Sequence, residues 1–187
     1  MYPLAKTTEN SSAFDWFNYD YYPDSNGHKF ELYLHEHRTK SIKQLIELFE
    51  VLFSEVKDQI IIGQSKVGEE WGGFCMDTWD MNRQENNYDF SKLSSVTIDY
   101  LNLLLDSRIE FDYRGFCRCH DWEHFLRVIL GAIISHKAPY SPIFYNISSD
   151  YIFYFHHTFS IGLFYRKQND AVETILEQQK RNGYTLK

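Results

Sequence analysis

Residues 143–166 read IFYNISSDYIFYFHHTFSIGLFYR and contain three short runs that are dense in β-branched and aromatic side chains. The runs cover 143–145, 151–156 and 160–166, and the polar stretches 146–149 and 157–159 separate them. Short apolar runs joined by turn residues are typical of neighbouring strands that reverse direction. This part of the sequence therefore predicts an antiparallel meander.

Four segments outside the meander have the apolar spacing or the capping residues of helices. Ser41 can cap the first helix, Asp121 can cap the third, and Gly183 can end the last one. The expected helices cover 42–56, 95–107, 122–136 and a final segment that begins at residue 169 or 170.

Further strands are expected before the meander. Residues 30–37 alternate between apolar and polar side chains, and 60–62 is a short apolar run. Residues 74–79 follow a glycine pair and are predicted to be another strand, and 109–119 is predicted to be extended with a break at Gly115. The stretches 63–73 and 80–92 are predicted to be a loop and an exposed excursion, respectively.

Together these elements predict an α+β fold with a mixed, largely antiparallel sheet, about four helices and a C-terminal meander followed by a helix. A chain of 187 residues can bury one full core, so we expect a single globular domain over 1–187. Residues 1–28 are expected to form an irregular N-terminal arm. Aromatic residues make up 18% of the chain, which provides more contact-forming surface than a core needs.

The formal net charge of −7 is concentrated in the first half of the chain. Residues 1–100 contain 17 acidic and 9 basic side chains, whereas residues 101–187 contain 9 and 10. Nucleic acid is an unfavourable direct ligand because phosphate binding requires a clustered positive field. A basic protein is the more favourable partner.

The cysteines Cys75, Cys117 and Cys119 are odd in number, and two of them are too close in sequence for a comfortable disulfide. Reduced thiols favour a reducing compartment, so cytoplasmic residence is expected. No apolar run approaches the roughly 20 residues that cross a bilayer, and no membrane association is expected.

Two stretches mix acidic and aromatic residues in a way that suits docking onto a basic partner. The first is AFDWFNYDYYPD at 13–24, which contains no basic residue, and the second covers 69–89, where Arg83 is the only cation. If the fold brings them together, they form an anionic face with aromatic anchors. The expected partner-binding residues are Asp15, Trp16, Tyr19, Asp20, Tyr21, Tyr22, Glu69, Glu70, Trp71, Asp77, Trp79, Asp80, Glu85 and Asp89. The competing interpretation is that the tryptophans belong to the core and the carboxylates are merely solvated.

Sulfur and nitrogen ligands that suit tetrahedral zinc occur in one short segment, at Cys117, Cys119, His120 and His124. Their spacing is poor because structural zinc usually takes two separated pairs of ligands. The run HDWEH at 120–124 has two histidines one helical turn apart, but its glutamate is not at the position of a zinc-protease base. We therefore expect no bound metal and no cofactor.

Eight histidines also allow a metal-independent nuclease that uses two imidazoles as acid and base. Four of them, namely His35, His37, His156 and His157, could alternatively supply distant imidazoles to the metal site considered above. The chain lacks the cluster of lysines and arginines that would hold a phosphodiester, and it has no phosphate loop or nucleophile elbow. Our expectation is that the protein is not an enzyme.

The overall profile resembles the immunity proteins that bacteria make against polymorphic or contact-dependent growth-inhibition toxins. The stretches FDWFNYDYYPD and EEWGGFCMDTWD carry this resemblance. It implies a tight complex with a cognate toxin domain, commonly a basic nuclease. Two alternatives remain, namely an inhibitor that imitates nucleic acid towards another nucleic-acid-binding machine, and a metal-binding or hydrolytic enzyme built on the Cys/His segment.

Overall fold

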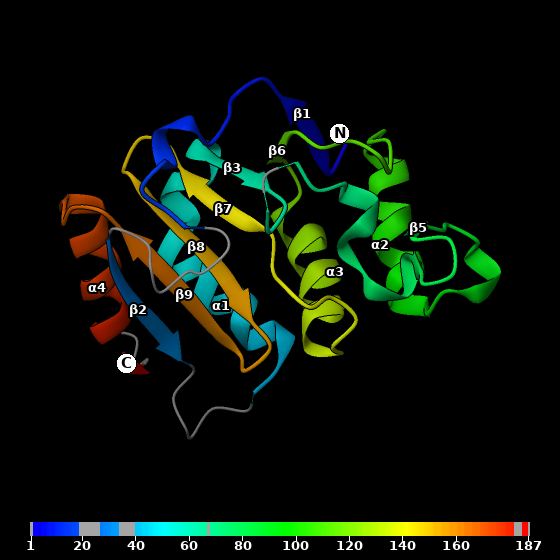
Figure 1. Cartoon of the computed structure of the whole chain (residues 1–187). Coiled ribbons are helices and arrows are strands. Elements are labelled where there is room, and N and C mark those ends of the chain that lie inside the picture. Colours follow the sequence, from blue (N-terminus) through cyan, green and yellow to red (C-terminus); the bar gives the residue numbers. More distant parts are fainter. Residues whose placement is uncertain (1, 19–26, 34–39, 67, 182–184, 187) are drawn as a thin grey trace.

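The computed structural model of the chain describes residues 2–18, 27–33, 40–66, 68–181 and 185–186 (Figure 1). Within these ranges the fold is a single α+β domain around an eight-stranded sheet with the order β1-β6-β3-β7-β8-β9-β2-β10. The strands are β1 (Leu4–Thr7), β2 (His28–Tyr33), β3 (Ile60–Gly63), β6 (Phe116–Cys119), β7 (Ile143–Asn146), β8 (Tyr151–His156), β9 (Ser160–Tyr165) and β10 (Thr185–Leu186). Each described pairing in this sheet is antiparallel, so the predicted α+β class and the β7-β8-β9 meander are confirmed.

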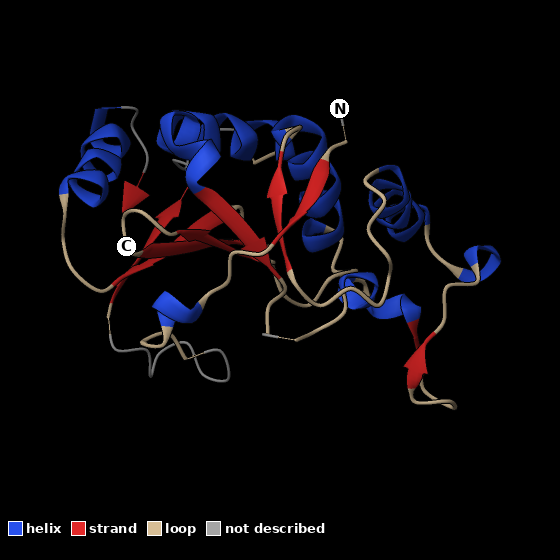
Figure 2. Cartoon of the chain, turned by 90° about the horizontal axis from the view of Figure 1, so that it is seen from above, coloured by secondary structure: helices blue, strands red, loops and turns tan. Residues whose placement is uncertain are grey.

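Three helices cover one face of the sheet, and a fourth lies beside this layer and packs against one of the three (Figure 2). The covering helices are α1 (Ile42–Phe53), α3 (Trp122–Ile134) and α4 (Asp170–Arg181), and the outer helix is α2 (Ser95–Asp106). Because α2 packs on α3 rather than on the sheet, the segments that lead into and out of α2 extend beyond the edge of the sheet.

The predicted helix caps are confirmed. The Ser41 hydroxyl accepts a hydrogen bond from the backbone N–H of Gln44 at 3.3 Å, and the Asp121 carboxylate accepts one from His124 at 3.0 Å. The Asn169 side chain caps α4 in the same way. The first helix ends at Phe53 rather than at residue 56, and a 3-10 helix, η3 (Ser54–Gln59), continues the chain to β3. Gly183 lies outside the described residues.

Aromatic side chains fill the space between the sheet and the helices. Phe153 lies at the centre, with its ring stacked on Phe53 at 4.1 Å and on Phe144 at 4.7 Å between centroids. On the opposite face of the sheet, Phe14 and Phe17 pack on Tyr145 and Phe164, respectively. The sheet is therefore buried on both faces in its central strands.

The predicted strand over 74–79 is wrong. This segment forms two 3-10 turns, η4 (Trp71–Phe74) and η5 (Met76–Thr78), followed by a small hairpin of β4 (Trp79–Asp80) and β5 (Glu85–Asn86). The backbone N–H groups of Trp71 and Gly72 donate to the loop carbonyls of Tyr113 and Phe111 at 2.9 and 2.7 Å, so they do not join a sheet. Residues 109–115 are likewise not a strand, and extended structure begins only at Phe116.

The N-terminal segment is more regular than expected. Residues 4–7 form the edge strand β1, which pairs with β6 through Leu4 opposite Cys119. Four residues are too few to show a period of two, so the sequence alone could not identify this strand. Residues 34–39 and 24–26 lie outside the described ranges, so the end of the predicted strand over 30–37 and most of the turn before it are not placed. No helix among the described residues combines the length and the apolar character needed to span a bilayer.

Candidate partner-binding cleft

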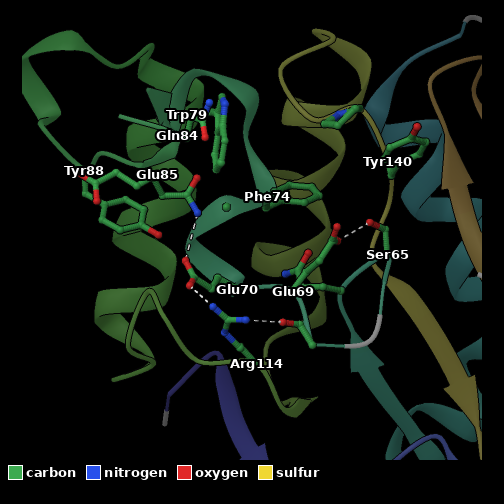
Figure 3. Close-up of a pocket in the computed structure, with 15 residues that line it drawn as sticks. Ser65, Glu69, Glu70, Phe74, Trp79, Gln84, Glu85, Tyr88, Arg114 and Tyr140 are labelled. Carbon is green, nitrogen blue, oxygen red and sulfur yellow. Dashed lines mark hydrogen bonds and ion pairs between the residues drawn. The ribbon is translucent and has the colours of Figure 1, made fainter. Parts of the chain in front are cut away.

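An open cleft of about 690 Å³ lies between the end of β3, the 3-10 turn η4 and the β4-β5 hairpin (Figure 3). Its lining mixes carboxylates with exposed aromatic rings. The lining residues are Gln64, Ser65, Gly68, Glu69, Glu70, Gly73, Phe74, Trp79, Gln84, Glu85, Asn86, Tyr88, Arg114, Pro139 and Tyr140. We call this site the acidic cleft.

Glycine is needed in the turn that forms one wall of the acidic cleft. A Cβ at Gly72 would lie 2.7 Å from the Cβ of Phe111 and 2.6 Å from the hydroxyl of Tyr88. Such a distance between Cβ atoms is prohibitively short, so only glycine lets the 3-10 turn approach the 109–115 loop this closely. Glu70 directly precedes this turn, and Glu69 is the residue before it.

Glu70 is held by two groups that come from distant parts of the chain. Arg114 donates to one carboxylate oxygen at 2.5 Å, and the side-chain amide of Asn86 donates to the other at 3.1 Å (Figure 3). The hydrogen bond from Asn86, followed by the hydrogen bond and charge of Arg114, lowers the pKa of Glu70 below its usual value. Glu70 is therefore an ionised anchor that joins the β4-β5 hairpin to the 109–115 loop.

Glu69 is held in place by two hydrogen bonds. One of its carboxylate oxygens, Oε2, accepts from the Ser65 hydroxyl at 2.8 Å and from the backbone N–H of Lys66 at 3.2 Å. Among the residues that the structure describes, no basic side chain lies within ion-pair distance of Glu69. Glu85 is more open, because its side chain is 61% exposed and its nearest cation, Arg83, is 3.9 Å away. These two carboxylates are the groups of the acidic cleft that a partner cation can approach.

Exposed apolar side chains concentrate around the acidic cleft. Trp79 is 48% exposed and Tyr140 is 60% exposed, and both line it (Figure 3). Met76 and Met81, which flank Trp79 in the sequence, are 51% and 79% exposed. Half-exposed Trp, Tyr and Met side chains beside a concave site are typical of protein-binding surfaces.

The acidic character of residues 69–89 is weaker in the fold than in the sequence. Arg114, Lys137 and Lys92 pair with Glu70, Asp77 and Asp89, respectively. With Arg83, four cations therefore face the six carboxylates of this stretch, which leaves a local net charge of −2. The stretch itself contains only Arg83, because Lys92 lies three residues beyond its end and Arg114 and Lys137 are distant along the chain.

Several predicted partner-binding carboxylates make structural hydrogen bonds. Asp77 accepts from the backbone N–H of Ser94 at 3.1 Å and from the Thr97 hydroxyl, so it holds the start of α2. Asp80 accepts backbone hydrogen bonds within the β4-β5 turn, and Asp89 caps the 3-10 helix η6 (Phe90–Lys92). These three groups order the rim of the acidic cleft and do not line it.

Two of the three predicted tryptophan anchors, Trp16 and Trp71, are buried, so neither side chain can serve as an exposed contact in this structure. Trp71 is fully buried and its indole N–H donates to the carbonyl of Gly115 at 2.9 Å. Trp16 is 7% exposed and donates to the Asp150 carboxylate at 3.0 Å. Composition could not distinguish an exposed aromatic strip from one that covers the second face of the sheet.

Residues 14–18 of the N-terminal strip do not line the acidic cleft. Asp15 is exposed but lies near Arg166, at 4.0 Å, and does not line the acidic cleft. The other expected residues of the strip, Tyr19, Asp20, Tyr21 and Tyr22, lie outside the described residues. Of the predicted set, the acidic cleft brings together Glu69, Glu70, Trp79 and Glu85.

Sequence reasoning missed Tyr140 and Arg114. Tyr140 lies in the segment Pro139-Tyr140-Ser141-Pro142. The two prolines indicate a loop, and a tyrosine in a loop is commonly exposed, so the sequence did contain a signal for this ring. Arg114 gave no local signal because its role depends on Glu70, which is 44 positions away.

Residues 117–124 contain thiols and imidazoles of the types that suit zinc, but the fold does not bring these groups together. Cys117 and Cys119 are buried in β6, and burial raises the pKa of both thiols well above the usual value. His120 and His124 are exposed. Within the described part of the chain, no group of three histidine, cysteine, aspartate or glutamate side chains has a geometry that could hold a metal ion.

Replacing Glu70 with glutamine should make the stability less dependent on pH. A lowered carboxyl pKa contributes stability that is present above the unfolded pKa, near 4.5, and is lost as pH falls through the folded pKa. The variant should be about 1 kcal/mol less stable at pH 7, since Arg114 is mostly exposed and the ion pair is screened, and the difference should shrink below about pH 4. Urea unfolding at pH 7, 5 and 3.5 measures this.

The matched control is Glu123→Gln, because Glu123 forms an exposed pair with Arg127 one turn along α3. Its loss should change the free energy of unfolding by less than about 0.5 kcal/mol. Equal effects of the two substitutions would contradict the anchoring role of Glu70.

Comparisons of the chain with protein-family models, with curated proteins and with solved structures found no match in any of the three.

Proposed function

We propose that the protein is a bacterial immunity protein, resident in the cytoplasm, that binds and neutralises a cognate toxin domain, namely a basic nuclease. The observation that carries this proposal is the acidic cleft, in which Glu69 and Glu85 are open to a partner and the exposed rings of Trp79 and Tyr140 lie beside them. Carboxylates and half-exposed aromatic rings in one concavity are the elements of a hot spot for a basic protein.

The two kinds of side chain act on different steps of binding. Carboxylates attract a basic surface over a range of about one Debye length and so increase the association rate. Aromatic rings that become desolvated in the complex slow its dissociation. A toxin nuclease needs basic residues to hold phosphates, so a carboxylate surface seated on those residues excludes the substrate.

The proposal is tested by the double variant Glu69→Lys with Glu85→Lys. Tagged wild-type protein should capture a basic toxin domain in stoichiometric amount from a lysate of the native host, identified by mass spectrometry. The charge-reversed protein should bind the identified domain about tenfold more weakly at low salt, mainly through slower association, and the difference should decrease at raised salt.

The control is Glu123→Lys with Glu177→Lys, which changes the same number of charges on exposed faces of α3 and α4. Each replacement adds two units of charge, so both double variants change the net charge from −7 to −3. If both lose affinity equally, binding depends on overall charge and not on the acidic cleft. Capture of no basic protein, or no inhibition of the captured toxin, would contradict the proposed function.

A further inference from the structure

A second pocket, of about 430 Å³, adjoins the acidic cleft, and the two sites share Pro139 and Tyr140. Three imidazoles form part of its lining, so we call it the histidine pocket. Its lining residues are Lys29, Glu31, Met76, Ile133, His136, Ala138, Pro139, Tyr140, Ser141, Tyr154, Phe155, His156 and His157. The exposed ring of Tyr140 therefore stands between two concavities on one continuous surface.

The imidazoles come from two separate elements and contact one another. His136 follows the end of α3 in the left-handed region, with φ at 58°, and its ring centroid is 5.0 Å from that of His157 in the turn after β8. His156 lies 4.2 Å from His157, and its ring nitrogen Nδ1 is 2.8 Å from the Thr158 hydroxyl. This arrangement presents aromatic surfaces rather than a set of metal ligands.

The histidine pocket contains permanent charges that offset each other. Its two permanently charged groups, Lys29 and Glu31, pair with each other at 3.0 Å. Burial, then the neighbouring His157, lowers the pKa of His156, which keeps this imidazole neutral at pH 7. Ile133, Ala138 and Phe155 contribute buried apolar surface. A charged side chain that entered the histidine pocket would lose its hydration, and Lys29 and Glu31 already pair with each other. Its burial there would therefore be unfavourable.

We propose that the histidine pocket receives an aromatic side chain of the same partner whose basic groups face the acidic cleft. This inference rests on the proposed function for the identity of the partner. A neutral ring suits imidazole, tyrosine and phenylalanine walls, since aromatic groups pack favourably in offset and edge-on arrangements. One partner segment that crosses Tyr140 would then place a cation on one side of this ring and an aromatic group on the other.

The test uses two small probes, N-acetyl-tyrosinamide and N-acetyl-argininamide, titrated into the full ¹⁵N-labelled protein at pH 7.5. Tyrosinamide should shift the backbone amide signals of His136, Ser141 and His157 saturably, with a dissociation constant on the order of millimolar. Argininamide should not saturate these signals. His157→Ala should weaken tyrosinamide binding at least about fivefold, as expected for the loss of one ring contact.

His120→Ala is the control, because His120 is exposed and does not line the histidine pocket. His157 is also exposed, so its replacement leaves the core intact, and a dispersed amide spectrum verifies folding. The inference is overturned if tyrosinamide causes no saturable shift at these amides, if argininamide binds there as well, or if His157→Ala leaves the affinity unchanged. No toxin takes part in this titration, so its failure is distinct from a failure to capture a basic toxin.

Discussion

Replacing Phe153 with alanine should lower the free energy of unfolding by about 3–5 kcal/mol, the range for deleting a large aromatic side chain from a packed core. The Phe153 side chain is fully buried and is stacked between Phe53 of α1 and Phe144 of β7. Its ring is also tilted against that of Phe49 and lies edge-on to that of Phe155. The alanine variant leaves a cavity between α1 and the sheet. These elements can close it only by giving up some of their other contacts.

Urea unfolding monitored by circular dichroism measures this effect. Because the alanine variant can lose most of the stability of an ordinary domain, Phe153→Leu provides a second value. Leucine keeps most of the volume and loses the two stacked contacts, so its cost should be about 1–2 kcal/mol. Phe90→Ala is the control, since Phe90 is only half-buried in η6 and should cost less. A loss for Phe153→Ala no larger than that for Phe90→Ala would contradict the central role of this ring.

The parts of the fold that were predictable from sequence are those in which local pattern and final environment agree. The meander has two polar turns between apolar runs, and Ser41 and Asp121 form the helix caps that their positions indicated. In these segments the residues within one turn or one strand decide the structure.

The acidic cleft was only partly predictable because it depends on contacts between distant segments. The turn at Trp71–Phe74 is set by backbone hydrogen bonds to the 109–115 loop, about 40 residues later in the chain, and the Glu70 carboxylate is held by Asn86 and Arg114, which are 16 and 44 positions away. A composition rich in Asp, Glu, Trp and Tyr indicated a docking surface. It could not indicate that Trp16 and Trp71 are buried whereas Trp79 is half exposed.

Trp79→Ala should weaken binding of the captured toxin domain by about 2–4 kcal/mol, which is roughly a thirtyfold to thousandfold increase in the dissociation constant. Trp79 projects from a two-residue strand with 48% of its surface exposed beside the open carboxylates of the acidic cleft. Because half of the ring is already solvent-accessible in the free protein, its removal should affect the complex much more than the fold. Tyr140→Ala should have a smaller effect of the same sign, mainly on the dissociation rate.

Leu105→Ala separates this prediction from a general loss of exposed apolar surface. Leu105 is 52% exposed on α2 and does not line the acidic cleft, so its removal should leave the dissociation constant within about twofold of wild type. Surface plasmon resonance gives both rate constants for each variant, and thermal unfolding verifies that all of them are folded. If Trp79→Ala binds like Leu105→Ala, the toxin contacts another face of the protein, and the exposed carboxylate of Asp15 becomes the next group to test.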